Sequence, residues 1–224
     1  MNLSDLSAQL GSCHYPEQMQ CVECGILGAG FYPGTNGYVG TPSHDGIMLL
    51  GRDFGTKKYY EPLCGMPPRD ETAPTWQRTR DVYLPVLTGI PVWCTNYIMG
   101  VRKDGSSVGN VKERITPSDW QRFEGDCWKF LHAQVLVQHP RIVVVLGGDN
   151  RDDLTATARL GTATQSDRPH RFESDGRQHA ARIVFGEHPH SLIPRVRQEA
   201  ARTDAERWTQ LYHSTPLCKC RTGA

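Results

Sequence analysis

Short runs of consecutive apolar residues, closed by glycine, constrain the fold of this chain most strongly. Residues 46–51 are Gly-Ile-Met-Leu-Leu-Gly, and residues 142–148 are Ile-Val-Val-Val-Leu-Gly-Gly. Four or five apolar residues without polar alternation are typical of a strand that is buried on both faces. Residues 91–98 and 181–185 are also predicted to form strands. Strands of this kind occur in parallel sheets that helices cover on both sides.

Helical patterns separate these strands. Helices are predicted near residues 74–87, from Thr116 to about His139, over 151–161 and over roughly 193–212. The second begins with a hydroxyl cap and a proline in its first turn, as helices commonly do. Strands alternate with helices at least four times, and this order predicts the α/β class. We expect an α/β/α sandwich with a central, mainly parallel four-stranded sheet.

The length of 224 residues suits a single domain over residues 1–224. Residues 1–45 are predicted to be a loop-rich N-terminal segment, and residues 213–224 a peripheral tail. Residues 99–115 and 162–179 are predicted to be loops, because their composition is polar and rich in turn-forming residues.

Charge and hydropathy limit the possible partners and compartments. The net charge of +1 gives no general attraction to nucleic acid, so any DNA contact must come from local basic loops. No apolar run approaches the length of a membrane span, and the first residues lack the pattern of a signal peptide. We therefore expect a cytoplasmic, monomeric protein without membrane contact.

Eight cysteines in a chain without an export signal are expected to be thiols or metal ligands rather than disulfides. Cys21 and Cys24 have the spacing of half a zinc or iron–sulfur site, and a tetrahedral site needs two further ligands. One interpretation is therefore a structural protein stabilised by a metal, with ligands drawn from Cys13, Cys21, Cys24, Cys218 and Cys220.

Three predicted strands end in polar side chains: Asp53, Asn96 and His188. Because the carboxyl ends of parallel strands lie at one edge of a sheet, these side chains are expected to converge on one pocket. Each also has a purely structural interpretation. Asp53 is a common turn former, Asn96 is a suitable strand-end cap, and His188 is a loop residue before proline.

The motifs around these residues resemble those of the uracil-DNA glycosylase superfamily. Residues 51–55 (Gly-Arg-Asp-Phe-Gly), residues 95–96 (Thr-Asn) and residues 188–192 (His-Pro-His-Ser-Leu) follow the order of its three motifs. The likeness spans about residues 45–200. The bacterial iron–sulfur branch is the most similar one, judging from residues 127–131 (Cys-Trp-Lys-Phe-Leu).

The resemblance implies a monofunctional DNA glycosylase that hydrolyses the N-glycosidic bond of uracil in DNA and initiates base-excision repair. Asp53 would stabilise the sugar cation and orient or deprotonate water, and His188 would stabilise the departing uracil anion at O2. Asn96 matches the N3–H and O4 of uracil, and cytosine presents the opposite pattern. Four further residues are implied to contact the base: Gly51, Arg52, Phe54 and Gly55. Phe54 is the first choice for the stacking aromatic, with Tyr59 or Tyr60 as the second.

The implied partners are uracil-containing DNA, single- or double-stranded, and the uracil product. Leu192 stands where the superfamily has its wedge residue, which fills the base stack after the nucleotide is flipped out. A core position in the last helix is the alternative for Leu192. The residues implied to contact DNA are His190, Ser191, Leu192 and Arg195. A rival interpretation of the whole chain is a non-catalytic lesion-binding protein that retains the uracil pocket.

The chain departs from the family pattern at several positions. Arg52 replaces the usual Gln or Glu, and Gly55 stands where the best-known branch has a tyrosine that excludes thymine. Of the four cluster ligands in the iron–sulfur branch, Cys21, Cys24 and Cys127 match three, and the remaining place, near Gly100, has no cysteine. We therefore expect no cluster, no other metal and no cofactor.

Overall fold

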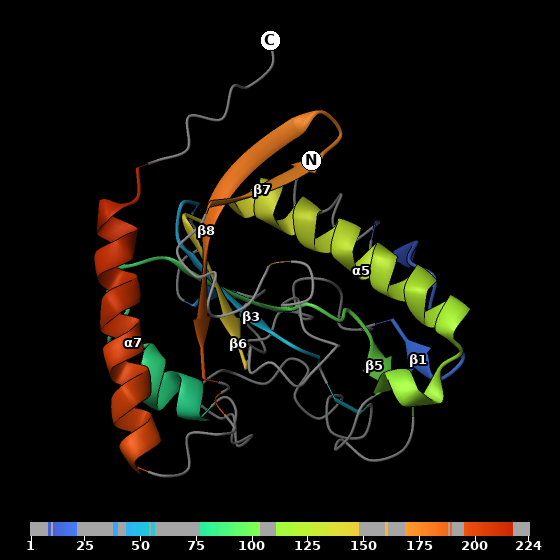
Figure 1. Ribbon diagram of the computed structural model, residues 1–224, viewed down its shortest axis with the longest axis horizontal. Coiled ribbons are helices and arrows are strands. Elements are labelled where there is room, and N and C mark those ends of the chain that lie inside the picture. Colours follow the sequence, from blue (N-terminus) through green and yellow to red (C-terminus); the bar gives the residue numbers. More distant parts are fainter. Residues whose placement is uncertain are drawn as a thin grey trace.

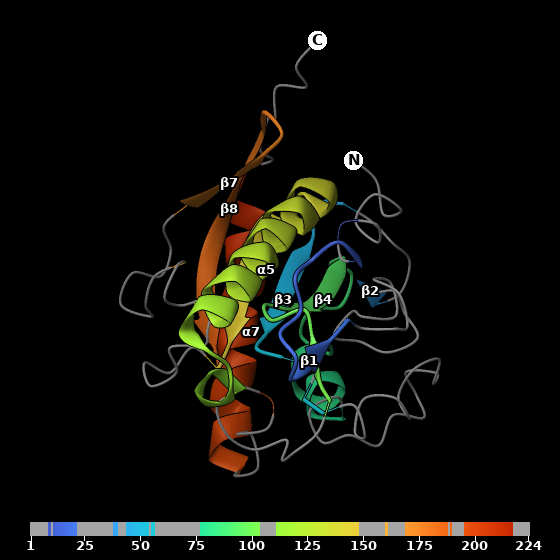
Figure 2. The same cartoon turned by 90° about the vertical axis from the view of Figure 1, so that its right-hand side faces the viewer.

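Figures 1 and 2 show the computed structural model from two directions. The structure describes residues 9, 11–21, 38–39, 44–53, 55–56, 77–103, 111–147, 160, 169–187, 189 and 195–216. Within these residues, no helix combines the length and the apolar composition that a bilayer-crossing helix needs.

A six-stranded sheet forms the centre of the described chain. Its order is β2 (Tyr38–Val39), β4 (Val92–Asn96), β3 (Ile47–Gly51), β6 (Ile142–Leu146), β8 (Arg177–Gly186) and β7 (Pro169–Ser174). The four middle strands run parallel, and each edge strand is antiparallel to its neighbour. The α/β class is confirmed. The sheet is larger than the four strands expected, because each edge carries one additional antiparallel strand.

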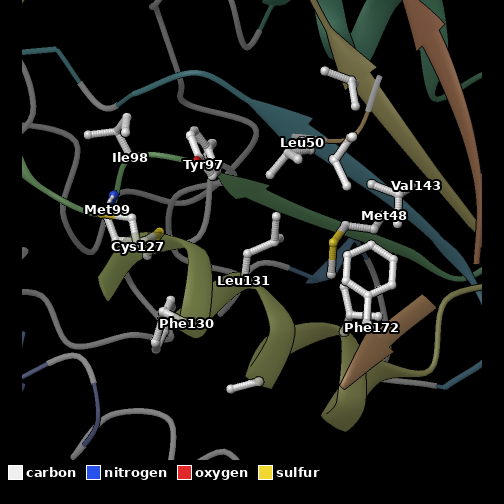
Figure 3. Close-up of a cluster of buried hydrophobic side chains, with 14 of the residues drawn as sticks. Met48, Leu50, Tyr97, Ile98, Met99, Cys127, Phe130, Leu131, Val143 and Phe172 are labelled. Atoms are coloured by element: carbon white, nitrogen blue, oxygen red, sulfur yellow. Dashed lines mark hydrogen bonds between the residues drawn. The ribbon is translucent and has the colours of Figure 1, made fainter. Parts of the chain in front are cut away.

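Helices cover both faces of the sheet (Figure 1). Helix α5 (Pro117–Gln138) packs on one face, and α7 (Arg195–Ser214) packs on the other with η3 (Thr79–Tyr83). Side chains of β3 alternate between the faces: Met48 and Leu50 join the α5 core, and Ile47 and Leu49 join the α7 core. This two-sided burial explains the continuous apolar runs. Figure 3 shows Met48, Leu50 and Val143 meeting residues of α5 and Phe172 of β7.

Helix α5 begins and ends as its sequence predicts. Thr116 is extended, and its side chain accepts a hydrogen bond from the backbone N–H of Asp119 at 3.3 Å. The helix stops at His139, whose φ of 50° lies in the left-handed region, and the N–H of His139 donates to the carbonyl of Val135. The capping signals around residues 116–119 therefore predicted this boundary correctly.

The prediction of a loop over 162–179 is wrong for residues 169–179, which belong to a β-hairpin. Strands β7 and β8 pair antiparallel around Asp175 and Gly176, which both have positive φ, 51° and 73°. Two-residue hairpin turns of type I′ need that backbone geometry, and Asp-Gly is among their preferred sequences. Phe172 is fully buried in the α5 core, which fixes the face that β7 presents to the helix.

The segment 99–115 also contains regular structure, contrary to its prediction as loop. Strand β5 (Val101–Arg102) pairs antiparallel with β1 (Met19–Gln20), and a 3₁₀ turn, η4, covers Val111–Arg114. Strand β1 belongs to the N-terminal segment 1–45 that we expected to be rich in loops. The N-terminal segment is thereby attached to the chain that follows β4 (Figure 2).

The remaining helices differ from prediction in detail. The helix predicted near residues 74–87 contains a π-helical turn over Thr79–Tyr83, where the N–H of Leu84 reaches the carbonyl of Thr79 at 3.1 Å. Helix α7 ends at Ser214, inside the predicted tail. The helix predicted at 151–161 lies outside the described residues except for Leu160.

Candidate functional site

The carboxyl ends of β4, β3, β6 and β8 lie along one edge of the sheet. Strand β3 comes first in the chain, β4 joins it on one side, and β6 and then β8 follow on the other. The strand order therefore reverses direction at β3, which makes the β3–β6 boundary a topological switch point. In open α/β sheets, ligands bind outside the carboxyl ends of the strands at such a point.

Asp53 leaves the sheet at this place, two residues after β3. Its Oδ2 accepts hydrogen bonds from Arg102 Nη2 at 2.9 Å and from Arg52 Nε at 3.1 Å. Its Oδ1 accepts the backbone N–H of Gly55 at 2.8 Å. The side chains of Asp53 and Arg102 are only 9% and 5% exposed. Asp53 is therefore a turn former, as one interpretation held, and also a nearly buried carboxylate in contact with two guanidinium groups.

The loop after β3 is bonded to the loop after β4. Tyr97 and Ile98 donate backbone N–H groups to the carbonyls of Gly51 and Arg52, at 2.9 and 2.8 Å, and Arg102 N–H donates to Gly55 O at 3.0 Å. Gly55 has a φ of 78°, a conformation that side-chain-bearing residues rarely adopt. The main chain thus holds the first two motifs against each other.

Asn96 is the last residue of β4, and its register partner on β3 is Gly51. The residue is 1% exposed. It lies on the same face of β4 as Val92 and Cys94, which belong to the α7 core. Its Oδ1 is buried, and no hydrogen-bond donor of the described chain reaches it. Most buried side-chain oxygens in proteins accept a hydrogen bond from a donor, so the Oδ1 of Asn96 is an exception.

The end of β8 is held by the segment before β4. Tyr83 Oη donates to the carbonyl of Glu187 at 2.6 Å, and Arg78 Nη1 donates to the carbonyl of Pro189 at 3.4 Å. Burial raises the pKa of Tyr83 above its usual range, so its hydroxyl remains a donor. Both carbonyls flank His188 in sequence, so the backbone on either side of the third motif's histidine has a fixed anchor.

Several predicted site residues lie outside the described part of the chain: Phe54, His188, His190, Ser191 and Leu192. Tyr59 and Tyr60, the alternative stacking aromatics, lie outside it too. Of the DNA-contact residues only Arg195 is described. It opens α7, its side chain is 91% exposed, and it pairs with Glu199 at 3.2 Å. The structure therefore brings Gly51, Arg52, Asp53, Gly55 and Asn96 together, and the roles predicted for all of these residues stay predictions.

The position that lacks a cluster ligand is filled by side chains. A Cβ built on Gly100 would lie 2.9 Å from Phe123, 3.0 Å from Met19 and 3.4 Å from Tyr15. Nearby, Tyr15 Oη donates to the carbonyl of Met99 at 3.2 Å. A ligand side chain at position 100 would therefore need Phe123 and Met19 to shift.

Of the described cysteines in this region, Cys127 is buried, and Cys13 and Cys21 are partly exposed. Cys127 is fully buried on α5 and accepts the backbone N–H of Met99 at 3.4 Å, an approach visible in Figure 3. Burial raises the pKa of Cys127 above its usual range and that of Cys13 to about 11. In the described ranges, no group of three or more His, Cys, Asp or Glu residues could hold a metal ion.

Sequence patterns did not reveal two of the contacts that shape the site. Arg102 lies in a segment that was predicted only as a loop, and Tyr83 in one that was predicted only as a helix. Arg102 is 49 residues from Asp53, and Tyr83 is 104 residues from Glu187. Contacts over such separations leave no local pattern, so no signal in the sequence would have identified them.

A scan against protein-family models finds none that matches this chain, and a search of curated proteins finds no match.

Proposed function

We propose that this protein is a monofunctional DNA glycosylase that hydrolyses the N-glycosidic bond of uracil in DNA. The product DNA would carry an abasic site, from which base-excision repair begins. The observation that carries the proposal is the buried Oδ1 of Asn96, which the described chain leaves without a donor at the strand edge that also holds Asp53.

A buried acceptor without a donor costs about 1–3 kcal/mol. A ligand that supplies the donor would remove this cost. Uracil offers N3–H to Oδ1 and accepts at O4 from the Asn96 side-chain NH₂. Cytosine has no N3–H and carries an amino donor at C4, which would face that NH₂. Binding cytosine would leave buried polar groups unpaired, and unpaired groups of this kind give strong discrimination.

Asp53 supplies the negative charge that the reaction needs beside the sugar. Departure of the base builds positive charge on the sugar, as in glycoside hydrolysis, and a fixed carboxylate stabilises that charge. In the proposed mechanism Asp53 also orients the attacking water. His188 donates a hydrogen bond to uracil O2 as negative charge develops there, and the anchored carbonyls of Glu187 and Pro189 support its position.

The remaining roles follow the motif order. Gly51, Arg52, Phe54 and Gly55 line the base, with Phe54 stacking on it. His190, Ser191, Leu192 and Arg195 contact the DNA around the flipped nucleotide, with Leu192 as the wedge. The exposure of Arg195 at the first turn of α7 suits a phosphate contact. Such a site works as a monomer on single- or double-stranded DNA.

The test uses an end-labelled oligonucleotide with one uracil, incubated with the protein and then treated with alkali. We expect strand breakage at the uracil, and none in matched oligonucleotides that contain cytosine or thymine. Asp53→Asn and His188→Ala should each slow breakage by about 10²–10⁴-fold, because each removes charge stabilisation from the transition state. Binding of the same DNA, measured by gel shift, should change little for Asp53→Asn.

Three outcomes would contradict this proposal. One is a wild-type protein that leaves the uracil strand intact. Another is a pair of variants that both break the strand at the wild-type rate. Binding of uracil DNA without any alkali-labile site would instead indicate the lesion-binding protein.

A further inference from the structure

The hydrogen bonds of Asp53 leave its carboxylate with little freedom. A carboxylate accepts about four hydrogen bonds. Three are taken by protein donors: Arg102 and Arg52 at Oδ2, and the Gly55 N–H at Oδ1. Among the described residues no further donor reaches Asp53. One acceptor position is therefore open, and it lies on Oδ1.

The two guanidinium groups differ in how firmly they are held. The Arg52 side chain is 29% exposed and neighbours Asp53 in sequence. The Arg102 side chain is 5% exposed, and its backbone is held on two sides. Arg102 pairs with Met19 in the β1–β5 ladder, and its N–H donates to Gly55 O at 3.0 Å. Strand β1 of the N-terminal segment thus holds the backbone of Arg102 in place, and the Arg102 side chain holds Asp53.

We propose that Arg102 is the positioning residue of this site: it fixes the Asp53 carboxylate so that one acceptor position, on Oδ1, faces a single water. This inference rests on the proposed glycosylase function and adds the residue that selects the water. The guanidinium does two things. Together with Arg52 it compensates the charge of a nearly buried carboxylate, and it holds Oδ2 so that the carboxylate cannot rotate.

Rotation of the Asp53 carboxylate would move the water that it holds away from the sugar. Displacement of a reacting group by about 1 Å can slow an enzyme by about 10²-fold. A carboxylate that lost Arg102 would keep its charge partner Arg52 and its Gly55 hydrogen bond, and it would turn about the latter. The loss of Arg102 should therefore reduce the rate of bond cleavage and leave the affinity for DNA unchanged.

The experiment is a double-mutant cycle in single-turnover kinetics, with enzyme in excess over a uracil-containing duplex. The variants are Arg102→Met, Arg102→Lys, Asp53→Asn and the Asp53→Asn/Arg102→Met double variant. Arg122→Met, an exposed arginine of α5, is the matched control. Circular dichroism melts establish that each protein is folded at the assay temperature.

We expect Arg102→Met to slow cleavage by about 10²-fold, with the dissociation constant for the duplex within about twofold of wild type. Arg102→Lys should recover part of the rate, because it returns a charge without the planar fork. In the Asp53→Asn background, Arg102→Met should cause no further slowing, since it acts through Asp53. Arg122→Met should cleave at the wild-type rate.

The outcomes separate this inference from the proposed function. A wild-type protein that releases no uracil overturns both. An active wild type overturns the inference alone in either of two cases: Arg102→Met slows the Asp53→Asn protein as much as it slows the wild type, or both Arg102 variants cleave at the wild-type rate. If Arg102→Met does not fold, Arg102→Lys and its Asp53→Asn double variant decide by the same comparison.

Discussion

Polar side chains at the two ends of the parallel strands differ in their hydrogen bonding. We call these ends the amino edge and the carboxyl edge of the sheet. At the amino edge, His179 donates from Nε2 to the carbonyl of Pro140 at 2.7 Å. Arg141 lies 4.7 Å from the ring of Tyr212 and donates to the carbonyls of Tyr212 and Thr215, where α7 ends. At the carboxyl edge, Asn96 keeps a buried oxygen without a donor from the described chain. Among the described residues the buried Nε of Arg141 is unpartnered as well, but its guanidinium group is bound to the end of α7 through Nη1. The unpartnered atom of Asn96 is instead an acceptor.

This contrast predicts that substitutions at the two edges will separate stability from activity. A protein gives up some stability where a site is prepared for a ligand, so stabilising changes at a site commonly reduce function. Substitutions at the amino edge should instead change stability and leave the chemistry of the folded protein intact.

Among the substitutions that test this contrast, Asn96→Leu should have the largest effect. Asn96→Leu should slow uracil release by about 10²–10³-fold, because it removes the groups that read the base. The same change should leave the unfolding temperature equal or higher, since an apolar side chain of similar shape replaces a buried, unsatisfied oxygen. Single-turnover kinetics and thermal melts measure the two effects. A strong loss of stability would show that Asn96 is a structural cap.

The next effect is expected at Gly46, where β3 begins at the amino edge. A Cβ there would lie 2.0 Å from the carbonyl oxygen of Pro91, which accepts the N–H of Ile47 at 2.8 Å. Because the neighbour is backbone, Gly46→Ala should destabilise the fold by about 1–3 kcal/mol or more. Denaturant unfolding measures this.

The control for Gly46 is Gly125 of α5, whose added Cβ would meet nothing within 4 Å. Gly125→Ala should stabilise the protein by about 0.5–1 kcal/mol, as alanine does within helices. At temperatures where Gly46→Ala is folded, its cleavage rate should remain close to wild type. A much slower folded variant would indicate that the two edges are coupled.

A smaller effect is expected in how the unfolding temperature depends on pH, because two histidines lie at the amino edge. The rings of His139 and His179 are stacked with centroids 5.2 Å apart, and burial lowers the pKa of both. His44 and Arg177 also lower the pKa of His139, and Asp45 raises it. For His179 the neighbouring His139 lowers the pKa, and Asp45 and the Pro140 carbonyl raise it.

A histidine whose pKa is lower in the folded protein resists protonation there. Its contribution to stability is complete above the unfolded pKa, near 6.5, and is lost as pH falls from there through the lower pKa of the folded protein. We expect the unfolding temperature to drop between pH 7.5 and pH 5. His139→Asn, which tolerates the left-handed backbone at this position, should drop less steeply. Parallel pH curves for the two proteins would contradict the role of this pair.

The smallest effect is expected at Arg80, which pairs with Asp81 at 2.9 Å on the surface of η3. The pair has the same spacing in sequence as Arg52 and Asp53, but both side chains are more exposed, at 39% and 61%. Arg80→Met should change the free energy of unfolding by at most about 0.5 kcal/mol and leave cleavage unaffected. A large effect on cleavage would show that surface charge, rather than the buried pair, governs this edge.

Local patterns predicted the parts of the fold that local physics determines. The apolar runs of β3 and β6 and the cap of α5 are encoded in consecutive residues, and their positions are confirmed. The strand predicted at 181–185 lies within β8. Strand β7 and the start of β8 were missed, although Asp175-Gly176 is a hairpin signal, because the surrounding residues are polar. Only Phe172 and alternate residues of β8 face the core, and this hairpin extends from one edge of the sheet (Figure 1).

The candidate site could be predicted as a set of strand ends but not as a network. Asp53 and Asn96 could be placed at one edge because parallel strands share a direction. That Asp53 would contact Arg102 depends on the pairing of β5 with β1, which brings together residues near 20 and 102. Two-residue strands carry no periodicity, so this ladder has no signature in the sequence.

The anchor between Tyr83 and Glu187 has a consequence for how the protein is made. During translation, Asp53 and Arg102 can meet when about half of the chain has been synthesised, whereas the Tyr83 anchor must wait for β8. Contacts of long sequence separation are slow to form, because a large loop must close first. A nascent chain would therefore be able to form the contact between Asp53 and Arg102 well before the Tyr83 anchor fixes the end of β8.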